Sequence, residues 1–417
     1  MRRIWILSEL YFPEQTSTGY ILTKIAEGLA EEYEVKVITG PATNFLHRDF
    51  HPDYEVKDGV EIFRCQTTSF NKDFFWGRLV NLLTQSIVIL GKADKLCQPR
   101  DIILVVTNPP LLPFVALILK WLKNCQFVLL IHDVYPEVLV AAGLCSSSSV
   151  IARIGRIVTA MLYTQASKII TLGRDMNSIV KNKLSNNSNK ENIFSKICLI
   201  PNWAEHETVK PSDRNNNPLL RELGCSDRFV VLYAGNMGKT HGIEDLGEVA
   251  NILQVESNIH FVVVGFGAKK KSLEDYVKSH NLQNMSIIPL SARPRSEQSV
   301  SLNAGDVALI SYVPGMAGVS VPSRMYNQMA AGKPIIAVAD DWSELAEVVR
   351  EENIGWVVKP GEIQELVRTI QFAANNRDLC AQMGIKAAEV AKTKYNFAQT
   401  NQAYKKLFQE IFSAYSS

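Results

Sequence analysis

The sequence has no long apolar run. Its longest, Leu111–Leu119, is interrupted by Pro113 and ends at Lys120, well short of the ~20 residues that a membrane-spanning helix needs. At the N-terminus only Ile4–Leu7 precedes Ser8, which is too short for the apolar region of a secretory signal peptide. We therefore expect a cytoplasmic protein, with peripheral attachment to the inner face of the cell membrane as an option.

The cysteines and the charges also lack an informative pattern. The seven cysteines are scattered and include no C-x-x-C pair, which favours a reducing compartment and disfavours a zinc site. His47 and His51 are four residues apart, but no acidic partner pattern accompanies them, so we expect no metal site. A net charge of +2 argues against a general nucleic-acid-binding protein.

A dinucleotide fingerprint is absent as well. Residues 9–20, which follow the first expected strand, contain Gly19 but no G-x-G-x-x-G. A nicotinamide-dependent enzyme is therefore disfavoured. Gly19 would permit close approach of a ligand to the backbone, and an ordinary turn in a surface loop is the alternative.

The chain does have the size and pattern of an α/β protein. Its 417 residues, with 47% apolar and 21% charged residues, are enough for two domains with separate cores. Short β-branched runs alternate with amphipathic helical stretches, which predicts parallel sheets with right-handed crossovers. We expect domains at 1–203 and 204–395, with a linker within His206–Asn217. The predicted strands are Ile4–Leu7, Val35–Thr39, Ile62–Arg64, Ile102–Val106, Phe127–Ile131, Lys168–Leu172, Ile197–Ile200, Phe229–Ala234, His260–Val264, Ser286–Pro289, Val307–Ser311, Pro334–Val338 and Trp356–Val358.

The segment Val319–Asp341 predicts a loop, a helix, a tight turn and a buried strand in succession. Ser323 can cap the helix, and Gly332 followed by Pro334 can end it. The apolar run Pro334–Ala339 then has the composition of a strand covered on both faces. A polar loop at a helix N-terminus suits a phosphate group, although an α/β unit without a ligand fits the same residues equally well.

Four further stretches accompany this segment. They are S-E-L-Y-F-P-E-Q-T-S-T-G-Y at Ser8–Tyr20, I-H-D-V-Y-P-E at Ile131–Glu137, I-P-N-W at Ile200–Trp203 and Y-A-G-N-M-G at Tyr233–Gly238. Together they resemble glycosyltransferase family 4, and within it the bacterial surface-polysaccharide branch of fucosamine- and colanic-acid-type transferases. The resemblance implies the GT-B fold, in which two Rossmann-like domains face each other across a cleft. It also implies that a terminal helix, residues 396–417, crosses back to the first domain.

The resemblance assigns catalytic roles to His132 and Asp133. It implies that His132 reaches the donor sugar, and imidazole suits this because it can donate or accept a proton near neutral pH. Asp133 would orient the site or cap the following helix. Without the resemblance, packing of His132 between sheet and helix is the simpler interpretation.

The resemblance also implies a set of donor-binding residues, with departures from the family pattern. Asn236 and His241 stand where relatives often carry Arg and Lys, so Lys239 and Arg324 become the candidate phosphate-binding cations. Val319 and Asn327 stand where relatives carry paired glutamates, and Asn327 could still hydrogen-bond the ribose. The donor-binding residues implied are Gly19, Gly235, Asn236, Lys239, Gly267, Ser320, Ser323, Arg324 and Asn327.

A basic amphipathic stretch lies between residues 151 and 162. Arg153 and Arg156 flank an apolar stripe that includes Ile151, Ile154 and Ile157. Such a helix can lie on anionic lipid, which makes an anionic membrane surface a candidate partner. The alternative is a core-facing helix with a solvated basic side.

The resemblance implies transfer of a sugar from a nucleotide-diphosphate sugar, UDP-linked by preference, to a saccharide or polyprenyl-linked saccharide acceptor. The reaction would retain the anomeric configuration, without a cofactor and without a metal at the diphosphate. Two alternatives stay open, namely a nucleotide-sugar epimerase of the same fold and a non-catalytic nucleotide-binding subunit.

Overall fold

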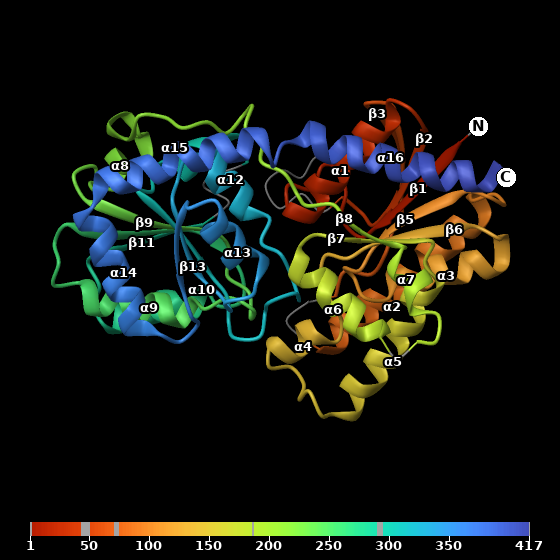
Figure 1. Cartoon of the computed structure of the whole chain (residues 1–417), viewed down its shortest axis with the longest axis horizontal. Helices are drawn as coiled ribbons and strands as arrows, with labels where there is room; N and C mark the ends of the chain where they lie inside the picture. The colour runs from red at the N-terminus through yellow and green to blue at the C-terminus, as the bar shows by residue number, and fades with distance from the viewer. Residues whose placement is uncertain (1, 43–50, 71–74, 186, 290–294, 417) are drawn as a thin grey trace. The chain divides into compact units, whose positions relative to one another are not determined.

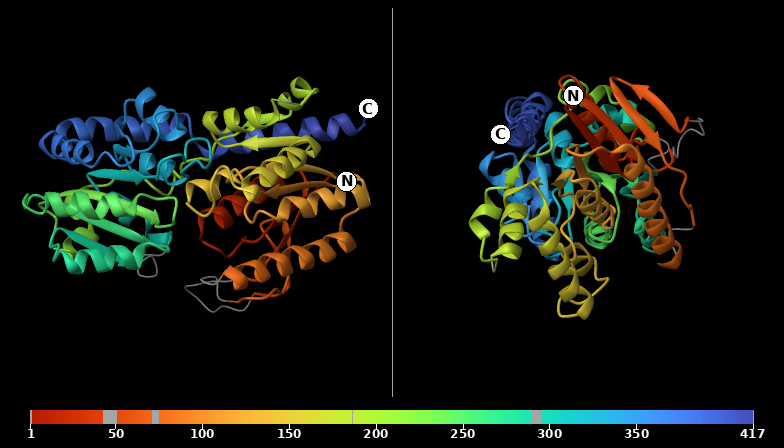
Figure 2. Two further views of the ribbon diagram at one scale, coloured as in Figure 1. Left: turned by 90° about the horizontal axis from the view of Figure 1, so that it is seen from below. Right: turned by 90° about the vertical axis from the view of Figure 1, so that its right-hand side faces the viewer.

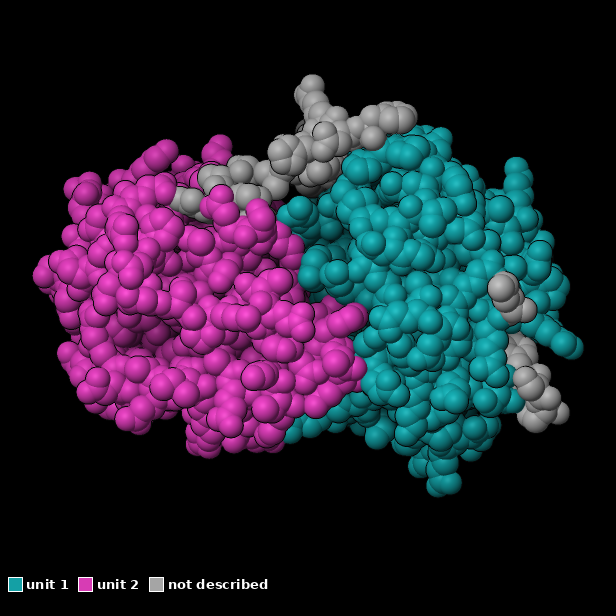
Figure 3. All heavy atoms as spheres, turned by 90° about the horizontal axis from the view of Figure 1, so that it is seen from above, with its two compact units in different colours: residues 1–136, 147–201, 400–417 teal, residues 137–146, 202–399 magenta. Residues whose placement is uncertain are grey.

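Buried β-branched runs form the strands of two separate sheets, and amphipathic helices cover them. The computed structural model describes residues 2–42, 51–70, 75–185, 187–289 and 295–416. It divides the chain into two units (Figures 1 and 3): unit 1 holds residues 1–136, 147–201 and 400–417, and unit 2 holds residues 137–146 and 202–399. The segment 137–146 lies inside the first domain predicted from the sequence, but it clusters with unit 2.

The sheet of unit 1 has the strand order β3-β4-β2-β1-β5-β6-β7-β8. Strand β5 (Ile102–Val106) is buried along its whole length, as expected for a parallel strand covered on both faces. The other strands are β1 (Arg3–Ser8), β2 (Glu34–Thr39), β3 (Tyr54–Lys57), β4 (Val60–Arg64), β6 (Gln126–Leu130), β7 (Lys168–Thr171) and β8 (Ile197–Leu199).

Strand β3 is absent from the sequence prediction. It pairs antiparallel with β4 at the edge of the sheet, and its residues alternate between exposed and half-buried positions. Asp58 and Gly59 connect the two strands with φ values of 48° and 78°, which suit a tight hairpin turn. The Asp-Gly pair is the sequence signal that marks this hairpin.

Helices cover both faces of the unit-1 sheet (Figures 1 and 2). One face carries α1 (Ser17–Ala30) and the terminal helix α16 (Phe397–Ser416). The ring of Tyr33, just after α1, stacks on Phe412 of α16 with ring centroids 5.4 Å apart. The opposite face carries α2 (Phe75–Leu96), α3 (Leu112–Lys123), α5 (Val150–Gln165) and α6 (Arg174–Leu184), and the short helix α7 (Lys190–Phe194) follows α6.

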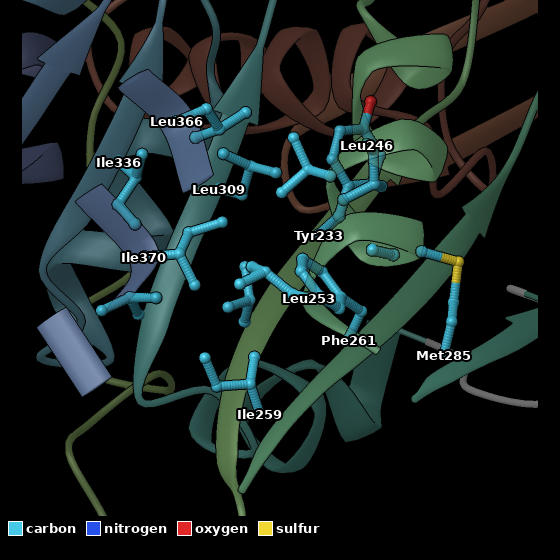
Figure 4. Packing of buried hydrophobic residues seen from close by; sticks show 14 of the residues in the cluster. Tyr233, Leu246, Leu253, Ile259, Phe261, Met285, Leu309, Ile336, Leu366 and Ile370 are labelled. Atoms are coloured by element: carbon cyan, nitrogen blue, oxygen red, sulfur yellow. The ribbon is translucent and has the colours of Figure 1, made fainter. Parts of the chain in front are cut away.

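The strands of unit 2 pair in parallel in the order β11-β10-β9-β12-β13-β14. Tyr233, Phe261 and Leu309 of the sheet meet Leu253 and Ile370 of the covering helices in one apolar core (Figure 4). The strands are β9 (Phe229–Asn236), β10 (Ile259–Phe266), β11 (Met285–Pro289), β12 (Val307–Ser311), β13 (Ile335–Val338) and β14 (Gly355–Val358). The helices of this unit are α4 (Glu137–Ala141), α8 (Pro218–Glu222), α9 (Ile243–Leu253), α10 (Lys270–Ser279), α11 (Gln298–Asn303), α12 (Arg324–Ala330), α13 (Glu344–Glu351), α14 (Ile363–Asn375) and α15 (Arg377–Thr393).

Residues 206–217, predicted as an interdomain linker, belong to unit 2. Asn303 donates a hydrogen bond to the carbonyl oxygen of Lys210 at 2.9 Å and accepts one from the Ser212 N–H at 3.0 Å. Arg214 forms a 2.9 Å ion pair with Asp306. This polar stretch is therefore held to unit 2 by hydrogen bonds and an ion pair.

Among the described helices, none is both long and apolar enough to cross a membrane.

Candidate functional site

The sheet of unit 2 has a topological switch point between β9 and β12. From β9 the chain continues outward to β10 and β11, and it then returns to the other side of β9 to form β12, β13 and β14. Open α/β sheets bind ligands at the carboxyl ends of the strands beside such a point. In unit 2 those ends are Asn236 of β9 and Ser311 of β12.

Arg324, the first residue of α12, lies beside this switch point. Its guanidinium carbon is 5.0 Å from the ring centroid of Tyr233 on β9. Its Nη1 is buried and has no hydrogen-bond partner within the described part of the chain. A buried donor without an acceptor costs about 1–3 kcal/mol, and more when the group is charged. The guanidinium also lies against Tyr233 and Tyr312, but its Nη1 is left for an anionic oxygen that the described residues do not supply.

A second cation, Lys269, follows β10. Its ammonium group donates to the carbonyl oxygen of His241 at 2.8 Å and to the carboxylate of Glu244 at 2.7 Å. Burial, and then the charges of Arg324 and Lys269, lower the pKa of His241 to about 2. The imidazole of His241 is therefore neutral near pH 7, and Arg324 and Lys269 are the cations beside it.

Two glycines allow close packing at the carboxyl ends of β9 and β10. A Cβ atom at Gly235 would lie 2.9 Å from Nη1 of Arg324, and a Cβ at Gly267 would lie 2.6 Å from the carbonyl oxygen of Met237. Their φ values are 144° and 140°, which side-chain-bearing residues rarely adopt. Glycine is thus needed at both positions for the strand ends and Arg324 to approach each other.

The other residues predicted here have more open surroundings. Asn236 and Lys239 are exposed, and Ser320 and Ser323 are half-buried before α12. Lys239 forms no ion pair with any described residue. Ser323 occupies the N-cap position of α12, as predicted, but its side chain makes no capping hydrogen bond.

Asn327 lies one turn after Arg324 on α12, and its amide is bound to Glu205. The Glu205 N–H donates to Oδ1 of Asn327 at 2.9 Å, and Nδ2 of Asn327 donates to Oε1 of Glu205 at 3.3 Å. Arg295 forms an ion pair with the same carboxylate oxygen. Residues three apart on a helix share a face, so Arg324 and the Asn327–Glu205 pair lie on one side of α12.

In unit 1, His132 and Asp133 follow β6. The hydroxyl of Thr107, just after β5, accepts the N–H of His132 at 3.1 Å and the N–H of Asp133 at 3.2 Å. It also donates to the carbonyl oxygen of Asp133 at 2.9 Å. Nε2 of His132 is buried without a hydrogen-bond partner among the described residues, and burial lowers the pKa of this histidine to about 4.

Gly19 lies in the first turn of α1 and not in the preceding loop, since α1 begins at Ser17. A Cβ atom at this position would lie 2.9 Å from the Cβ of Glu14. Within unit 1, Gly19 therefore serves the close packing of residues 9–16 against α1. Of the two histidines for which no metal site is expected, His51 is half-buried and His47 lies outside the described residues.

Three residues of the site are not among those predicted from the sequence, namely Lys269, Glu205 and Thr107. Lys269 follows a strand and Gly267, a position that could have drawn attention to it. Glu205 reaches Asn327 across 122 positions of the chain, and no local pattern signals such a contact. Thr107 follows a predicted strand directly, but one hydroxyl in that position is not specific.

Comparison with known proteins gives a consistent result. Residues 221–390 match the family described as glycosyl transferases group 1. The chain is 31% identical over 372 residues to WbjE of Pseudomonas aeruginosa, which is named as a probable glycosyltransferase, and the match covers 89% of each chain. It is 25% identical to WcaI of Escherichia coli (strain K12), which is named for colanic acid biosynthesis, over 87% of this chain and 90% of that one.

Solved structures share the fold at low identity. A sucrose-phosphate synthase from Thermosynechococcus elongatus superposes with a TM-score of 0.79 at 18% identity, covering 99% of this chain and 100% of the other. HepE of Anabaena in complex with UDP-glucose superposes with a TM-score of 0.71 at 16% identity, covering 98% and 100%. The two parallel-rich sheets and these similarities agree with the fold expected from the sequence. The chain belongs to the group 1 glycosyltransferases of the GT-B fold and is a transferase.

Proposed function

We propose that this transferase moves a sugar from a UDP-linked donor to a saccharide or polyprenyl-linked saccharide acceptor, with retention at the anomeric carbon. The observation that carries the proposal is the buried Nη1 of Arg324 at the switch point of unit 2, which has no hydrogen-bond partner among the residues that the structure describes. A diphosphate offers the anionic oxygen that this group lacks. The complex of HepE with UDP-glucose and the naming of WcaI for colanic acid biosynthesis support the donor and acceptor classes.

The two cations of unit 2 would serve the chemical step. Negative charge grows on the leaving diphosphate as its bond to the sugar breaks, and positioned donors stabilise that charge in a site from which water is excluded. Arg324 is already in place. Lys269 pairs with Glu244, whose side chain is 61% exposed, so Lys269 can exchange this carboxylate for a phosphate at little cost.

We propose that Asn327 and Glu205 together hold the ribose hydroxyls. Oε1 of Glu205 is occupied by Asn327 and Arg295, whereas Oε2 has no partner among the described residues. A free carboxylate oxygen is a good acceptor for a sugar hydroxyl. Because Arg324 lies one turn away on the same face of α12, the arrangement follows the order of diphosphate and ribose in a nucleotide.

The proposed reaction is tested by product analysis. Thermal-shift measurements with UDP, GDP and ADP and their sugar conjugates should show the largest stabilisation with the UDP series, since a ligand that binds the native state raises its stability. Incubation with the selected donor and a lipid-linked saccharide should then release UDP and lengthen the acceptor. An epimerised nucleotide sugar without UDP release would identify the epimerase alternative, and binding without any turnover would identify the non-catalytic one.

The assignment of Asn327 and Glu205 to the ribose predicts that replacing either residue weakens nucleotide binding to a similar extent. Asn327→Leu and Glu205→Gln should each weaken binding of both UDP and UDP-sugar, by about tenfold for the loss of a hydrogen bond to a charged group, as measured by calorimetry. Glu352→Gln is the control, because Glu352 pairs with Lys394 just before the edge strand β14, at its amino end and away from the carboxyl ends of β9 and β12. A loss seen only with the UDP-sugar would place Asn327 elsewhere in the site.

The close approach of Gly235 to Arg324 predicts a further loss of UDP affinity. Gly235→Ala should displace Arg324, because the new Cβ would lie 2.9 Å from its Nη1, and UDP affinity should fall at least several-fold. Gly361→Ala is the matched control, since Gly361 also has a positive φ of 84° but has no atom within 4 Å of the added Cβ. Both variants carry backbone strain, so equal UDP affinity in the two would contradict the placement of Arg324.

A further inference from the structure

Large exposed hydrophobic side chains gather on one helix layer of unit 1. They lie on α2, α3 and α5, which are neighbours on the same face of the sheet (Figure 1). In unit 2 such side chains lie on separate elements: Val255 follows α9, Trp342 precedes α13 and Ile385 is on α15. Single exposed hydrophobics are ordinary, whereas gathered ones mark a contact surface. The layer exposes Trp76, Val80, Leu83, Ile87 and Val88 on α2, Trp121 and Leu122 on α3, and Val150, Ile151, Ile154, Ile157 and Met161 on α5.

Helix α5 presents one continuous apolar stripe to solvent. Val150, Ile154, Ile157 and Met161 follow the spacing i, i+4, i+7, i+11, which places them on one face of a helix. Ile157 is 70% exposed. The sequence left open whether the stripe faces the core or the surroundings of the protein, and the structure shows that it faces outward.

Helix α2 repeats this spacing. Trp76, Val80, Leu83 and Ile87 also follow i, i+4, i+7, i+11, and Trp76 is 73% exposed. Trp121 lies on α3, which contacts both α2 and α5. Two exposed apolar stripes and two exposed tryptophans are typical of helices that lie in a bilayer interface.

The charges of the layer indicate the sign of the charge on its partner. Helices α2, α3 and α5 together carry seven Lys and Arg residues but only one acidic residue, Asp94, although the whole chain has a net charge of only +2. Asp94 is paired with Lys123. Arg153, on α5, is exposed and forms no ion pair with any described residue. The apolar stripes therefore lie within a basic surface.

We propose that the helix layer α2–α3–α5 of unit 1 docks on an anionic lipid surface. The stripes enter the interfacial region, and the basic residues beside them meet lipid phosphates. The choice of a membrane rests on the proposed lipid-linked acceptor, because docking would confine enzyme and acceptor to one surface. Vesicle binding is measured without nucleotide sugar, so its failure is separate from failure of the proposed reaction.

The test is co-sedimentation of the full chain with vesicles. Vesicles of phosphatidylglycerol and phosphatidylcholine should bind the wild type at low salt, and vesicles of phosphatidylcholine alone should bind it weakly. Binding should fall as salt shortens the Debye length from about 30 Å at 0.01 M to about 10 Å at 0.1 M. The tryptophan emission should shift to shorter wavelength on binding, since Trp76 and Trp121 leave water.

Variants separate the contributions of the apolar and the basic residues to vesicle binding. The double variant Ile154→Ser/Ile157→Ser should weaken binding by roughly a hundredfold, at about tenfold for each buried isoleucine. Arg153→Glu should weaken it by roughly 25-fold, at about fivefold for each charge. Val255→Ser/Ile385→Ser is the matched control, because these residues are 84% and 72% exposed in unit 2, and it should bind like wild type.

Two outcomes would overturn the proposal. Equal sedimentation of the wild type and the Ile154→Ser/Ile157→Ser variant with anionic vesicles would show that this layer is not the contact. Absence of vesicle binding at any salt, together with a self-associated wild type that the same variant converts to a monomer, would identify the layer as an interface between copies of this chain.

Discussion

Replacing Arg324 with alanine is expected to weaken UDP binding by roughly 10- to 150-fold. Loss of a hydrogen bond to a charged group costs about 1.5–3 kcal/mol, and each 1.4 kcal/mol is a factor of ten in Kd. Calorimetric titration with UDP measures this directly. The effect should appear with both UDP and UDP-sugar, because the proposed contact is with the diphosphate that the two share.

The same replacement also removes the contacts of the guanidinium with Tyr233 and Tyr312 in the ligand-free protein. We therefore expect the melting temperature of Arg324→Ala to be no higher than that of the wild type, and its rise on adding UDP to be smaller. The smaller rise, and not the melting temperature alone, identifies Arg324 as a ligand-binding group.

Arg350→Ala is the control for Arg324. Arg350 lies on α13 in the same unit and pairs with Asp341 at 2.6 Å on the surface, so its loss should leave UDP affinity unchanged. If a folded Arg324→Ala variant binds UDP as tightly as the wild type does, the assignment of Arg324 to the diphosphate is wrong.

His132→Ala is expected to lower kcat by a factor of ten or more and to leave UDP affinity nearly unchanged. The proposed role of His132, in unit 1, is at the donor sugar, whereas the proposed nucleotide contacts Arg324 and Glu205 belong to unit 2. A positioned polar or proton-transferring group contributes about 10²–10⁴-fold to a chemical step. Steady-state kinetics at saturating donor, with UDP titration alongside, measure the two quantities.

The low pKa of His132 adds a pH signature. Burial lowers this pKa to about 4, from about 6.5 in an unfolded chain, so the native imidazole stays neutral between these values. Loss of activity on acidification through pH 6.5 should not come from His132. The unfolded chain binds the extra proton, however, so the contribution of His132 to stability should fall as pH drops from about 6.5 to about 4.

His260→Ala is the matched control for His132. Burial also lowers the pKa of His260 to about 4, but this histidine bonds Ser286 at 2.9 Å within the sheet of unit 2. Its replacement should lower the melting temperature without a selective loss of kcat. Full turnover in His132→Ala would instead assign His132 to packing.

Local sequence patterns predict most of the fold. Strand β5 has the predicted bounds Ile102–Val106, because an uninterrupted β-branched run fits a strand buried on both faces. Helix α12 ends at Ala330, and Gly332 follows with a φ of 67°, as predicted from the Gly and Pro signals at its end. These features depend on neighbours within a few residues, which a single sequence displays.

The site could be predicted only in part, because its contacts join distant segments. Arg324 is predicted from its own helix, but the glycine that makes room for it, Gly235, lies on strand β9. The interaction of Asn327 with Glu205 and the position of Lys269 beside His241 depend on how strand ends meet. The order of residues in the sequence shows which of them follow each strand. The distances between these residues can be predicted only when the order of the strands in the sheet is known.

The path of α16 has a consequence for how the protein is made. Residues 400–417 belong to unit 1 together with the first 136 residues, whereas most of unit 2 comes from the unbroken segment 202–399. Domains usually fold in the order in which they leave the ribosome. Here the N-terminal unit must wait for its last helix, which buries Phe408 and Phe412 near Tyr33. The C-terminal unit can therefore be complete during synthesis before the unit that began first.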